Sequence, residues 1–248
     1  MRLDGRRCSH CGECVEICPT EAIRKDRRTG KILIDQDLCV ECGTCLRAGC
    51  CPEPGALIRP ELGWPRILRR LFSDPETVHA GTGVPGRGTE EIKTNDVSGR
   101  LGPGRIGVSI DMGRPGLSTT FNDIQTVAMA CAGAGARFEP RNPLTSLLAD
   151  RNLGTVAPEV LGERVLSAII EVEIEEPRLV GLLEALRKAE GRIATVFSVG
   201  LGFLAQRGRS SRILGKIRKA TGQRPLPNGK INVGLGKPPF ARPGGKRA

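Results

Sequence analysis

Cysteine is the residue type whose number and spacing in this chain indicate chemistry. The 248 residues include ten cysteines, and nine of them lie between Cys8 and Cys51. The first four, Cys8, Cys11, Cys14 and Cys18, follow the pattern C-x-x-C-x-x-C-x-x-x-C, and Pro19 comes directly after them. The first residues, MRLDGRRCSH, are charged and contain no apolar stretch, so we expect no secretory signal. In such a chain, closely spaced cysteines favour metal binding over disulfide bonds.

The cysteine pattern occurs twice. Cys39, Cys42 and Cys45 start a second copy 31 residues after Cys8, and each copy ends in a similar phrase, CPTEAI at 18–23 and CPEPGALI at 51–58. The run resembles that of bacterial two-cluster ferredoxins, in which three cysteines bind one 4Fe-4S cluster and the fourth reaches the other. The repeat predicts pseudo-twofold symmetry. It assigns one cluster to Cys8, Cys11, Cys14 and Cys51, and the other to Cys39, Cys42, Cys45 and Cys18.

The last ligand of the second copy departs from the pattern. Five residues rather than three separate Cys45 from Cys51, and Cys50 lies next to Cys51. We choose Cys51 because a proline follows it, as Pro19 follows Cys18, and Cys50 stays open as the alternative. The rival interpretations are two structural zinc sites or a redox dithiol. Triplets at three-residue steps suit one tetrahedral ion poorly, so we predict two 4Fe-4S clusters as the cofactors.

The segments around the cysteines have predicted structure of their own. Residues 22–35 are expected to form a hairpin with a polar turn at 28–30, which packs over the clusters. His10 is expected to face solvent. Residues 61–104 form a predicted Gly/Pro-rich linker with a helical candidate at 64–72. Its glycines at 81, 83 and 86 match G-x-G-x-x-G, but no hydrophobic strand precedes them and Pro85 interrupts them, so we favour a loop over a nucleotide site.

Residues 105–204 are predicted to form a second domain of α+β class. Apolar residues alternate at 106–112 and at 168–174, which indicates strands, and further strands are expected at 136–139 and 193–199. A helix follows the N-cap candidates at 118–120, with an apolar stripe that includes Cys131, a small buried residue in this interpretation. A second helix follows Pro177 and ends at Gly191. The structure of residues 142–163 is not predicted.

The order of these elements, β-α-β-β-α-β, is that of a ferredoxin-like sandwich, and it resembles small docking domains of the ACT type. The fold does not dictate function. We identify no paired carboxylates facing a pocket, so the catalytic residues are unknown, and we expect a docking or dimerisation domain. Glu171, Glu173 and Glu175 point to the face opposite the apolar one, either as a solvated surface or as a contact for a basic partner.

The formal net charge of +11 is concentrated at one end of the chain. Residues 205–248 hold twelve Lys or Arg and no acid, which leaves 38 − 12 = 26 basic residues against 27 acidic ones in 1–204. We predict a flexible basic tail with a short helix at 212–219. Phe240 is its sole aromatic residue, so base stacking is poorly supported. An acidic partner protein is favoured over nucleic acid.

Four further phrases resemble the iron-sulfur portion of the 6-hydroxynicotinate reductase family. They are GTGVPGRGTEEIKTNDVSGR (81–100), RPGLSTTFNDIQ (114–125), NPLTSLL (142–148) and NGKINVGLGKP (228–238). This resemblance implies anaerobic reduction of a ring or a similar substrate, with low-potential electrons passing from the ferredoxin domain toward a flavin. It implies that this chain is the electron-delivering part and that its partner is a flavoprotein reductase.

The sequence therefore predicts a cytoplasmic iron-sulfur electron-transfer subunit, an oxidoreductase component with no membrane span. Its predicted parts are a two-cluster domain (1–60), a linker (61–104), an α+β docking domain that is a candidate for homodimerisation (105–204) and the tail (205–248). The alternatives are a self-contained anaerobic reductase, with its substrate site formed by the glycine loop and the second domain, and a redox-sensing regulator that binds nucleic acid.

Overall fold

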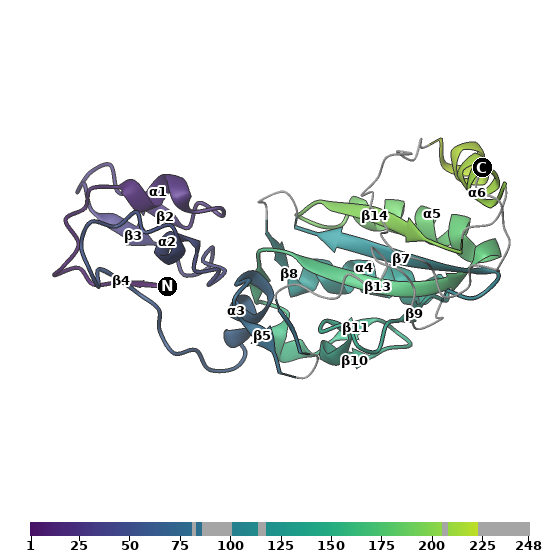
Figure 1. Cartoon of the computed structure of the whole chain (residues 1–248), viewed down its shortest axis with the longest axis horizontal. Helices are drawn as coiled ribbons and strands as arrows, with labels where there is room; N and C mark the ends of the chain where they lie inside the picture. Colours follow the sequence, from purple (N-terminus) through teal and green to yellow (C-terminus); the bar gives the residue numbers. More distant parts are fainter. Residues whose placement is uncertain (81–82, 86–100, 114–117, 205–207, 223–248) are drawn as a thin grey trace, which may run out of the picture.

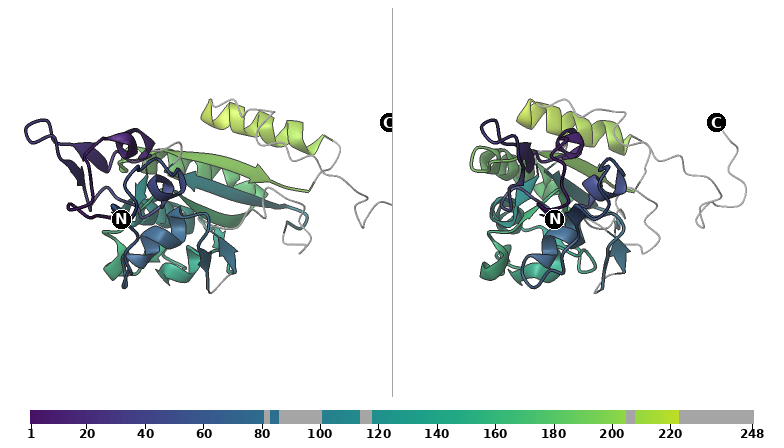
Figure 2. Two further views of the ribbon diagram at one scale, coloured as in Figure 1. Left: turned by 60° about the vertical axis from the view of Figure 1, so that its left-hand side comes forward. Right: turned by 90° about the vertical axis from the view of Figure 1, so that its left-hand side faces the viewer.

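The computed structural model describes residues 1–80, 83–85, 101–113, 118–204 and 208–222. It is a mixed helix and strand structure in two parts (Figure 1). The N-terminal module, residues 1–58, lies at one end of the long axis, and a four-stranded sheet with its helices forms the rest. Figure 2 brings the N-terminal module, in purple, to the front. No helix in the described part of the chain is both long and apolar enough to cross a membrane.

The N-terminal module contains two small antiparallel strand pairs and two short helices. Strand β1 (Arg2–Leu3) pairs with β4 (Leu57–Ile58), and β2 (Ile23–Lys25) pairs with β3 (Ile32–Ile34). Helices α1 (Glu13–Ile17) and α2 (Thr44–Arg47) each contain one buried cysteine. The carboxylate of Asp26 accepts hydrogen bonds from the backbone N–H groups of Arg28 and Thr29 and closes the β2–β3 turn. The predicted hairpin is therefore confirmed.

The backbone repeats as the cysteines do. His10 and Glu41, 31 residues apart, both have a φ of 57°. Gly12 and Gly43 also have positive φ, 102° and 70°, and each is the N-cap of the helix that follows. Positive φ is costly for residues with a Cβ atom, so the glycines let each loop turn sharply between its second and third cysteine.

Helix α3 (Ile67–Ser73) connects the two modules and packs into the second one. Its Leu68 and Phe72 side chains are buried in the large core, and the Phe72 ring meets the Phe121 ring edge-on at 5.6 Å between centroids. The helix expected at 64–72 within the predicted linker is confirmed as α3, and its apolar face packs into the second core. Short strands β5 (Val78–His79) and β6 (Val84–Pro85) follow, and most of the glycine loop lies outside the described residues.

The second module is built on a four-stranded antiparallel sheet. Its order is β14 (Phe197–Gly202), β7 (Arg105–Met112), β13 (Ala168–Glu175) and β9 (Arg137–Phe138). Ile110 of β7 lies opposite Ile170 on one side and Val199 on the other, so the alternating apolar residues form one face. The strands predicted at 106–112, 136–139 and 168–174 are confirmed as β7, β9 and β13. The last strand begins at Phe197 rather than at 193.

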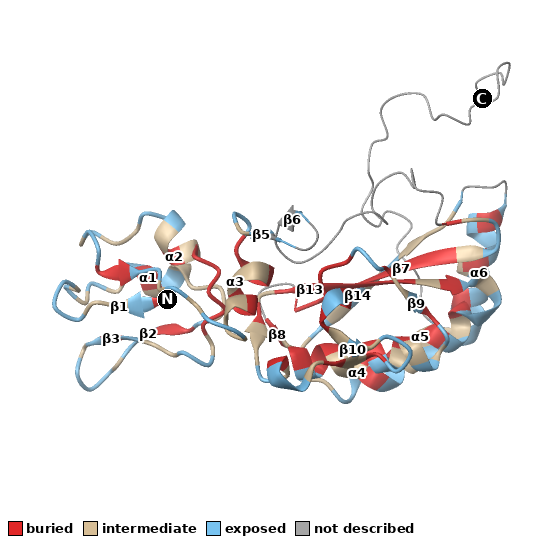
Figure 3. Cartoon of the chain, turned by 90° about the horizontal axis from the view of Figure 1, so that it is seen from below, coloured by how far each residue is buried: buried red, intermediate tan, exposed pale blue. Residues whose placement is uncertain are grey.

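Two helices cover the apolar face of this sheet (Figure 3). Helix α4 (Phe121–Gly133) starts with a capping box, in which Thr120 and Asp123 bond to each other's backbone N–H. Helix α5 (Leu179–Glu190) follows the turn η4 (Glu176–Arg178) and packs against α4. Both predicted helices are confirmed. Cys131 is fully buried on the apolar stripe of α4, as predicted, and burial raises the pKa of its thiol to about 12.

Residues 142–163, whose structure was not predicted from the sequence, form short strands and 3-10 turns beside α4. They are η2 (Thr145–Leu147), β10 (Leu148–Asp150), β11 (Thr155–Val156), η3 (Pro158–Val160) and β12 (Arg164–Val165), which pairs with β8 (Thr119–Thr120). The side-chain amide of Asn142 donates to the carbonyl of Ile169 at 3.1 Å, and its oxygen accepts from the N–H of Leu144. The NPLTSLL phrase thus includes a buried turn that is fastened to β13.

Two sequence expectations for this module need correction. Glu171 is 1% exposed, so the interpretation of the three glutamates as a solvated face is wrong at this residue, whereas Glu175 is exposed. Within the predicted tail, the short helix expected at 212–219 is confirmed as α6 (Arg209–Thr221), but this helix packs on the second module and is not part of a flexible tail. Ile213 and Ile217 are buried in the large core, and the Arg209 guanidinium is paired with Glu176. The apolar spacing of this helix gives it a packing face that its charge count concealed. Residues 223–248 lie outside the described part.

Candidate metal centre

The cysteines of the N-terminal module lie in two sets at its core. The second set consists of Cys18, Cys39, Cys42 and Cys45, which line one small cavity together with Gly43 and the apolar side chains of Ala22, Ile23 and Val40. Three of these four cysteines are buried, and Cys18 is half-buried. Cys18 belongs to the first sequence copy, so the chain crosses over to bring it there, as the repeat predicts.

The first set consists of Cys8, Cys11, Cys14, Cys50 and Cys51, and it is more open to solvent. Cys14 is buried, Cys11 is exposed, and the other three are half-buried. Cys50 Sγ lies 3.6 Å from the carbonyl oxygen of Cys45, and Cys51 Sγ lies 3.5 Å from that of Glu53. Cys50 and Cys51 both lie near Cys14, so proximity to this cysteine does not choose between them.

The thiol pKa values follow the same grouping. Burial raises the pKa of Cys14 to about 11, and the nearby Cys50, Cys11 and Cys51 add to this effect. Burial raises the pKa of Cys45 to about 12, with additions from Cys42, Cys39 and Cys18. The pKa of Cys50 is also raised, first by burial. These sulfurs are thiols by themselves, and they become thiolates when a metal compensates the charge.

The prediction that His10 faces solvent is wrong. It is half-buried, and its Nδ1 accepts a hydrogen bond from the N–H of Ile32 at 3.1 Å while lying 3.5 Å from Cys8 Sγ. Its ring therefore fastens the first cysteine loop to strand β3. Among the described residues, no group of three or more His, Cys, Asp or Glu side chains is arranged to hold a single metal ion.

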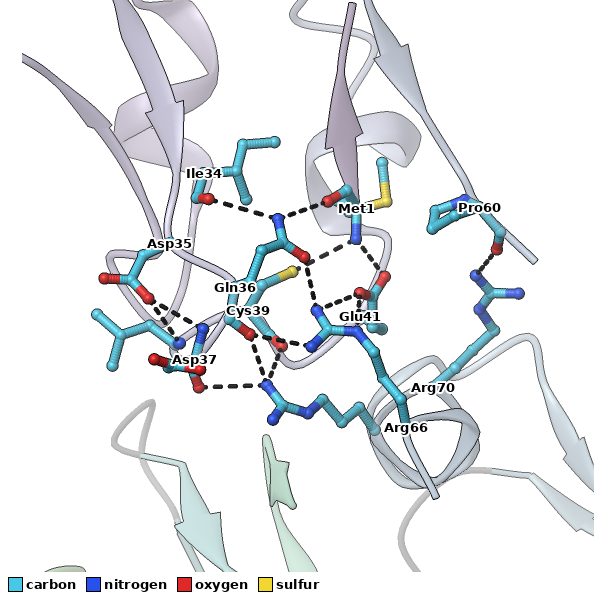
Figure 4. Close-up of polar contacts among 12 residues, drawn as sticks. Met1, Ile34, Asp35, Gln36, Asp37, Cys39, Glu41, Pro60, Arg66 and Arg70 are labelled. Atoms are coloured by element: carbon cyan, nitrogen blue, oxygen red, sulfur yellow. Dashed lines mark hydrogen bonds and ion pairs between the residues drawn. The ribbon is translucent and has the colours of Figure 1, made fainter. Parts of the chain in front are cut away.

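A network of arginines and buried acids surrounds the second set, and the sequence analysis missed it. Arg66 pairs with Glu41 and donates to Gln36, while Glu41 also pairs with the amino group of Met1 (Figure 4). That amino group lies 3.6 Å from Cys39 Sγ. Burial alone would raise the pKa of Glu41, but its bonds to the amino group and to Arg66 outweigh burial and lower it.

Two further arginines bind the backbone of the second set directly. Arg69 Nη1 donates to the carbonyls of Gln36 (2.8 Å), Asp37 (3.2 Å) and Cys39 (2.9 Å), and its Nε pairs with Glu163 of the second module. Arg47 Nη2 donates to the carbonyl of Cys42 at 2.7 Å, and its Nη1 pairs with the buried Asp74 at 2.7 Å. The two ion pairs, Arg47 with Asp74 and Arg69 with Glu163, join residues 27 and 94 positions apart, so spacing along the sequence gives no signal for them.

Comparison with known proteins points to the same centre. The 4Fe-4S binding domain family matches residues 2–24. The chain therefore carries a 4Fe-4S ferredoxin domain at its N-terminus. This domain is similar to parts of several iron-sulfur proteins, and no solved structure matches the chain.

Three curated relatives illustrate the similarity of the ferredoxin domain. The chain is 41% identical over 49 residues to the hydrogenase-2 operon protein HybA of Escherichia coli O157:H7, covering 19% of this chain and 14% of HybA. It is 39% identical over 80 residues to the arsenate respiratory reductase iron-sulfur subunit ArrB of Shewanella sp. (strain ANA-3), covering 32% and 31%. It is 39% identical over 61 residues to the protein NrfC of Escherichia coli (strain K12), covering 24% and 26%. The chain thus spans less than a third of each relative.

The residues of the second set fit a 4Fe-4S cluster. An all-sulfur donor set is what such clusters require, and the apolar lining of the cavity keeps water from them. The guanidinium groups of Arg47 and Arg69, bonded to the loop, provide positive charge near an anionic group. This is the chemistry of an electron-transfer centre rather than of a substrate site.

A second cavity lies on the other face of the large sheet, at its β9 edge. Its lining includes Arg137, Glu139, Glu171 and Glu173, with Glu139 and Glu171 at least nine-tenths buried. The expectation that no carboxylates of this module face a pocket is therefore wrong. The strand register places Glu173 beside Arg137 on β9, and the bend after β9 brings in Glu139, whose N–H donates to the carbonyl of Glu171.

Proposed function

We propose that this protein is an iron-sulfur electron-transfer unit with two 4Fe-4S clusters. Cys8, Cys11, Cys14 and Cys51 would hold one cluster, and Cys18, Cys39, Cys42 and Cys45 the other. The observation that carries the proposal is the cavity of the second set, where Cys18 of the first sequence copy joins three cysteines of the second. When bound, each cluster supplies one-electron transfer at a low potential.

The chain's own residues provide three things for this role. The cysteines would hold the iron as thiolates. The apolar side chains of Ala22, Ile23 and Val40 exclude water from the second set, and Arg47 and Arg69 fix its loop through backbone carbonyls. The greater exposure of the first set supports its use as the point of contact with an external donor or acceptor. Outer-sphere transfer requires only such an approach, without a substrate pocket at the cluster.

The second module and the partner belong to the same proposal. The strand order β14-β7-β13-β9, with α4 and α5 on one face, supports a ferredoxin-like sandwich of the ACT type that docks a partner. The phrases similar to the 6-hydroxynicotinate reductase family support a flavin-containing reductase as that partner. Regularly spaced cysteines support a reducing, cytoplasmic compartment.

The test begins with anaerobic purification and iron analysis. Two clusters predict about eight iron and eight sulfide per chain, with bleaching of the visible absorption by dithionite. Low-salt co-purification from the native host then identifies the partner and any bound flavin. About four iron per chain would refute the two-cluster proposal, and isolation without a flavoprotein would count against the delivery role.

The second cavity favours one alternative, a self-contained reductase with its substrate site on the sheet. Its four charged residues would bind a polar substrate. Turnover of a pyridine-type substrate by the dithionite-reduced chain alone, abolished in Glu171→Gln with iron content unchanged, would support this alternative over the subunit role.

A further inference from the structure

The two cysteine sets, alike in sequence, lie in opposite electrostatic surroundings. Helix α1 of the first copy has Glu13 and Glu16 in its first turn, whereas α2 of the second copy has no acid there and Arg47 in its last turn. The glycines that precede these helices show the same contrast. A Cβ atom at Gly12 would meet nothing within 4 Å, but one at Gly43 would lie 2.4 Å from Arg59 Nη2 and 2.8 Å from Arg47 Nη1. Guanidinium groups therefore lie directly against the second loop.

Cations outnumber acids around the second loop. Arg47 and Arg59 share Asp74, Arg66 pairs with Glu41, and Arg69 pairs with Glu163, so four guanidinium groups face three carboxylates. Arg47 and Arg69 also place an N–H group on the carbonyl of a cysteine of the second set, Cys42 and Cys39 respectively. In the described ranges, no guanidinium donates to the carbonyl of a first-set cysteine; Arg7 donates to Pro54, and a Cβ atom at Gly55 would lie 2.7 Å from Arg7 Nη1.

We infer that Arg47 and Arg69 raise the reduction potential of the cluster at Cys18, Cys39, Cys42 and Cys45 above that of the other cluster, so the first electron rests there. This inference rests on the proposed two-cluster function. Reduction adds one negative charge to a cluster without a proton, and nearby positive charge and hydrogen-bond donors stabilise that charge. Burial of the second set acts in the opposite direction, and the guanidinium groups offset it.

The position of α3 gives this asymmetry a direction. Arg69 of α3 holds the second cysteine loop on one side and Glu163 of the second module on the other. The higher-potential cluster is then the inner one, next to the second module, while the first set includes the exposed Cys11. An electron supplied by an external reductant at the first cluster moves inward, which oxidises the first cluster and reduces the second.

The test uses the full chain with both clusters and an EPR-monitored redox titration. In Arg47→Gln we expect the reduction equilibrium constant of one cluster to fall about tenfold, which is about 59 mV for a one-electron couple, while the other cluster is unchanged. Arg47→Lys keeps the charge and should retain most of the potential. Arg24→Gln is the matched control, because Arg24 is 63% exposed and pairs with Asp35 in the same module. A Cys42→Ser variant marks which signal belongs to the second set.

Two outcomes overturn the inference: no shift in Arg47→Gln, or a shift of the cluster that Cys42→Ser does not mark. Because Arg69→Gln also removes a link between the modules, the potentials of this variant test the inference only if its iron content is unchanged. Iron analysis of the unaltered chain separates this test from that of the proposed function. A chain with fewer than two clusters refutes the function, whereas two clusters with unshifted potentials refute the inference alone.

Discussion

Replacing Cys51 and Cys50 one at a time tests the ligand assignment of the first set. The backbone favours Cys51, because Glu21 and Gly55 both have positive φ and each precedes a buried alanine, Ala22 or Ala56. Along the chain, the separation of Cys51 from Ala56 is closer to that of Cys18 from Ala22 than the separation of Cys50 from Ala56 is. We therefore expect Cys51→Ser to lose the first cluster and Cys50→Ser to keep it.

The size of the effect follows from the separation of the two sets. Cys18, Cys39, Cys42 and Cys45 line their own cavity, so the loss of a first-set ligand leaves the second cluster in place. Iron in Cys51→Ser should fall from about eight to about four atoms per chain. Cys50→Ser should keep about eight, because its Sγ contacts a backbone carbonyl that water or the serine hydroxyl can also contact.

The assay is anaerobic iron and sulfide analysis, with the EPR spectrum of the dithionite-reduced protein. Wild-type protein, reconstituted in parallel, is the reference. A Cys50→Ser protein with about four iron and a Cys51→Ser protein with about eight would exchange the two roles. Loss of all iron in either variant would refute the claim that the two sets bind independently.

Three further predictions concern the framework that positions the site. Phe72→Ala should lower the free energy of unfolding by about 3–5 kcal/mol in urea denaturation, because a buried ring is lost from the α3–α4 contact. Trp64→Ala, at a 56% exposed position, should change the free energy of unfolding little. Equal effects would contradict the packing role of α3. Thr120→Ala should cost about 1 kcal/mol through the loss of the α4 N-cap. Thr126→Ala, at a half-buried position within the same helix, should cost less, and a smaller cost at 120 than at 126 would disprove the cap. Burial by itself would raise the pKa of Asp74, but bonds to the Glu76 N–H, Arg59, Thr77 and Arg47 lower it below 3.8. The ionised Asp74 therefore stabilises the fold at neutral pH, and this contribution is lost as the pH falls below that value. The difference in free energy of unfolding between wild type and Asp74→Asn should narrow from pH 6 to pH 3, and a constant difference would refute this.

Local patterns determined most of the elements. The steps between Cys8, Cys11 and Cys14 specify a loop that wraps one small group, because three residues of chain span only a short arc. The alternation in β7 and the cap of α4 act within a few residues, and both were confirmed. Their physical basis is the period of the side chains along a strand or helix, which the sequence carries directly.

Tertiary structure decided which distant residues meet. The arginines of α3 lie in the segment predicted as a linker, yet Arg69 donates to carbonyls about 30 residues away and pairs with Glu163, 94 residues away. The sequence pattern was compatible with a solvated Glu171, but in the structure this residue is buried beside the bend that follows β9. Helix α6 is rich in basic residues, yet it has an apolar face that packs on the core. Such contacts depend on how elements pack, because burial and pairing are properties of the assembled layers and not of any one segment. The sequence alone thus determined the cysteine chemistry, and only the fold decided which charges surround each set.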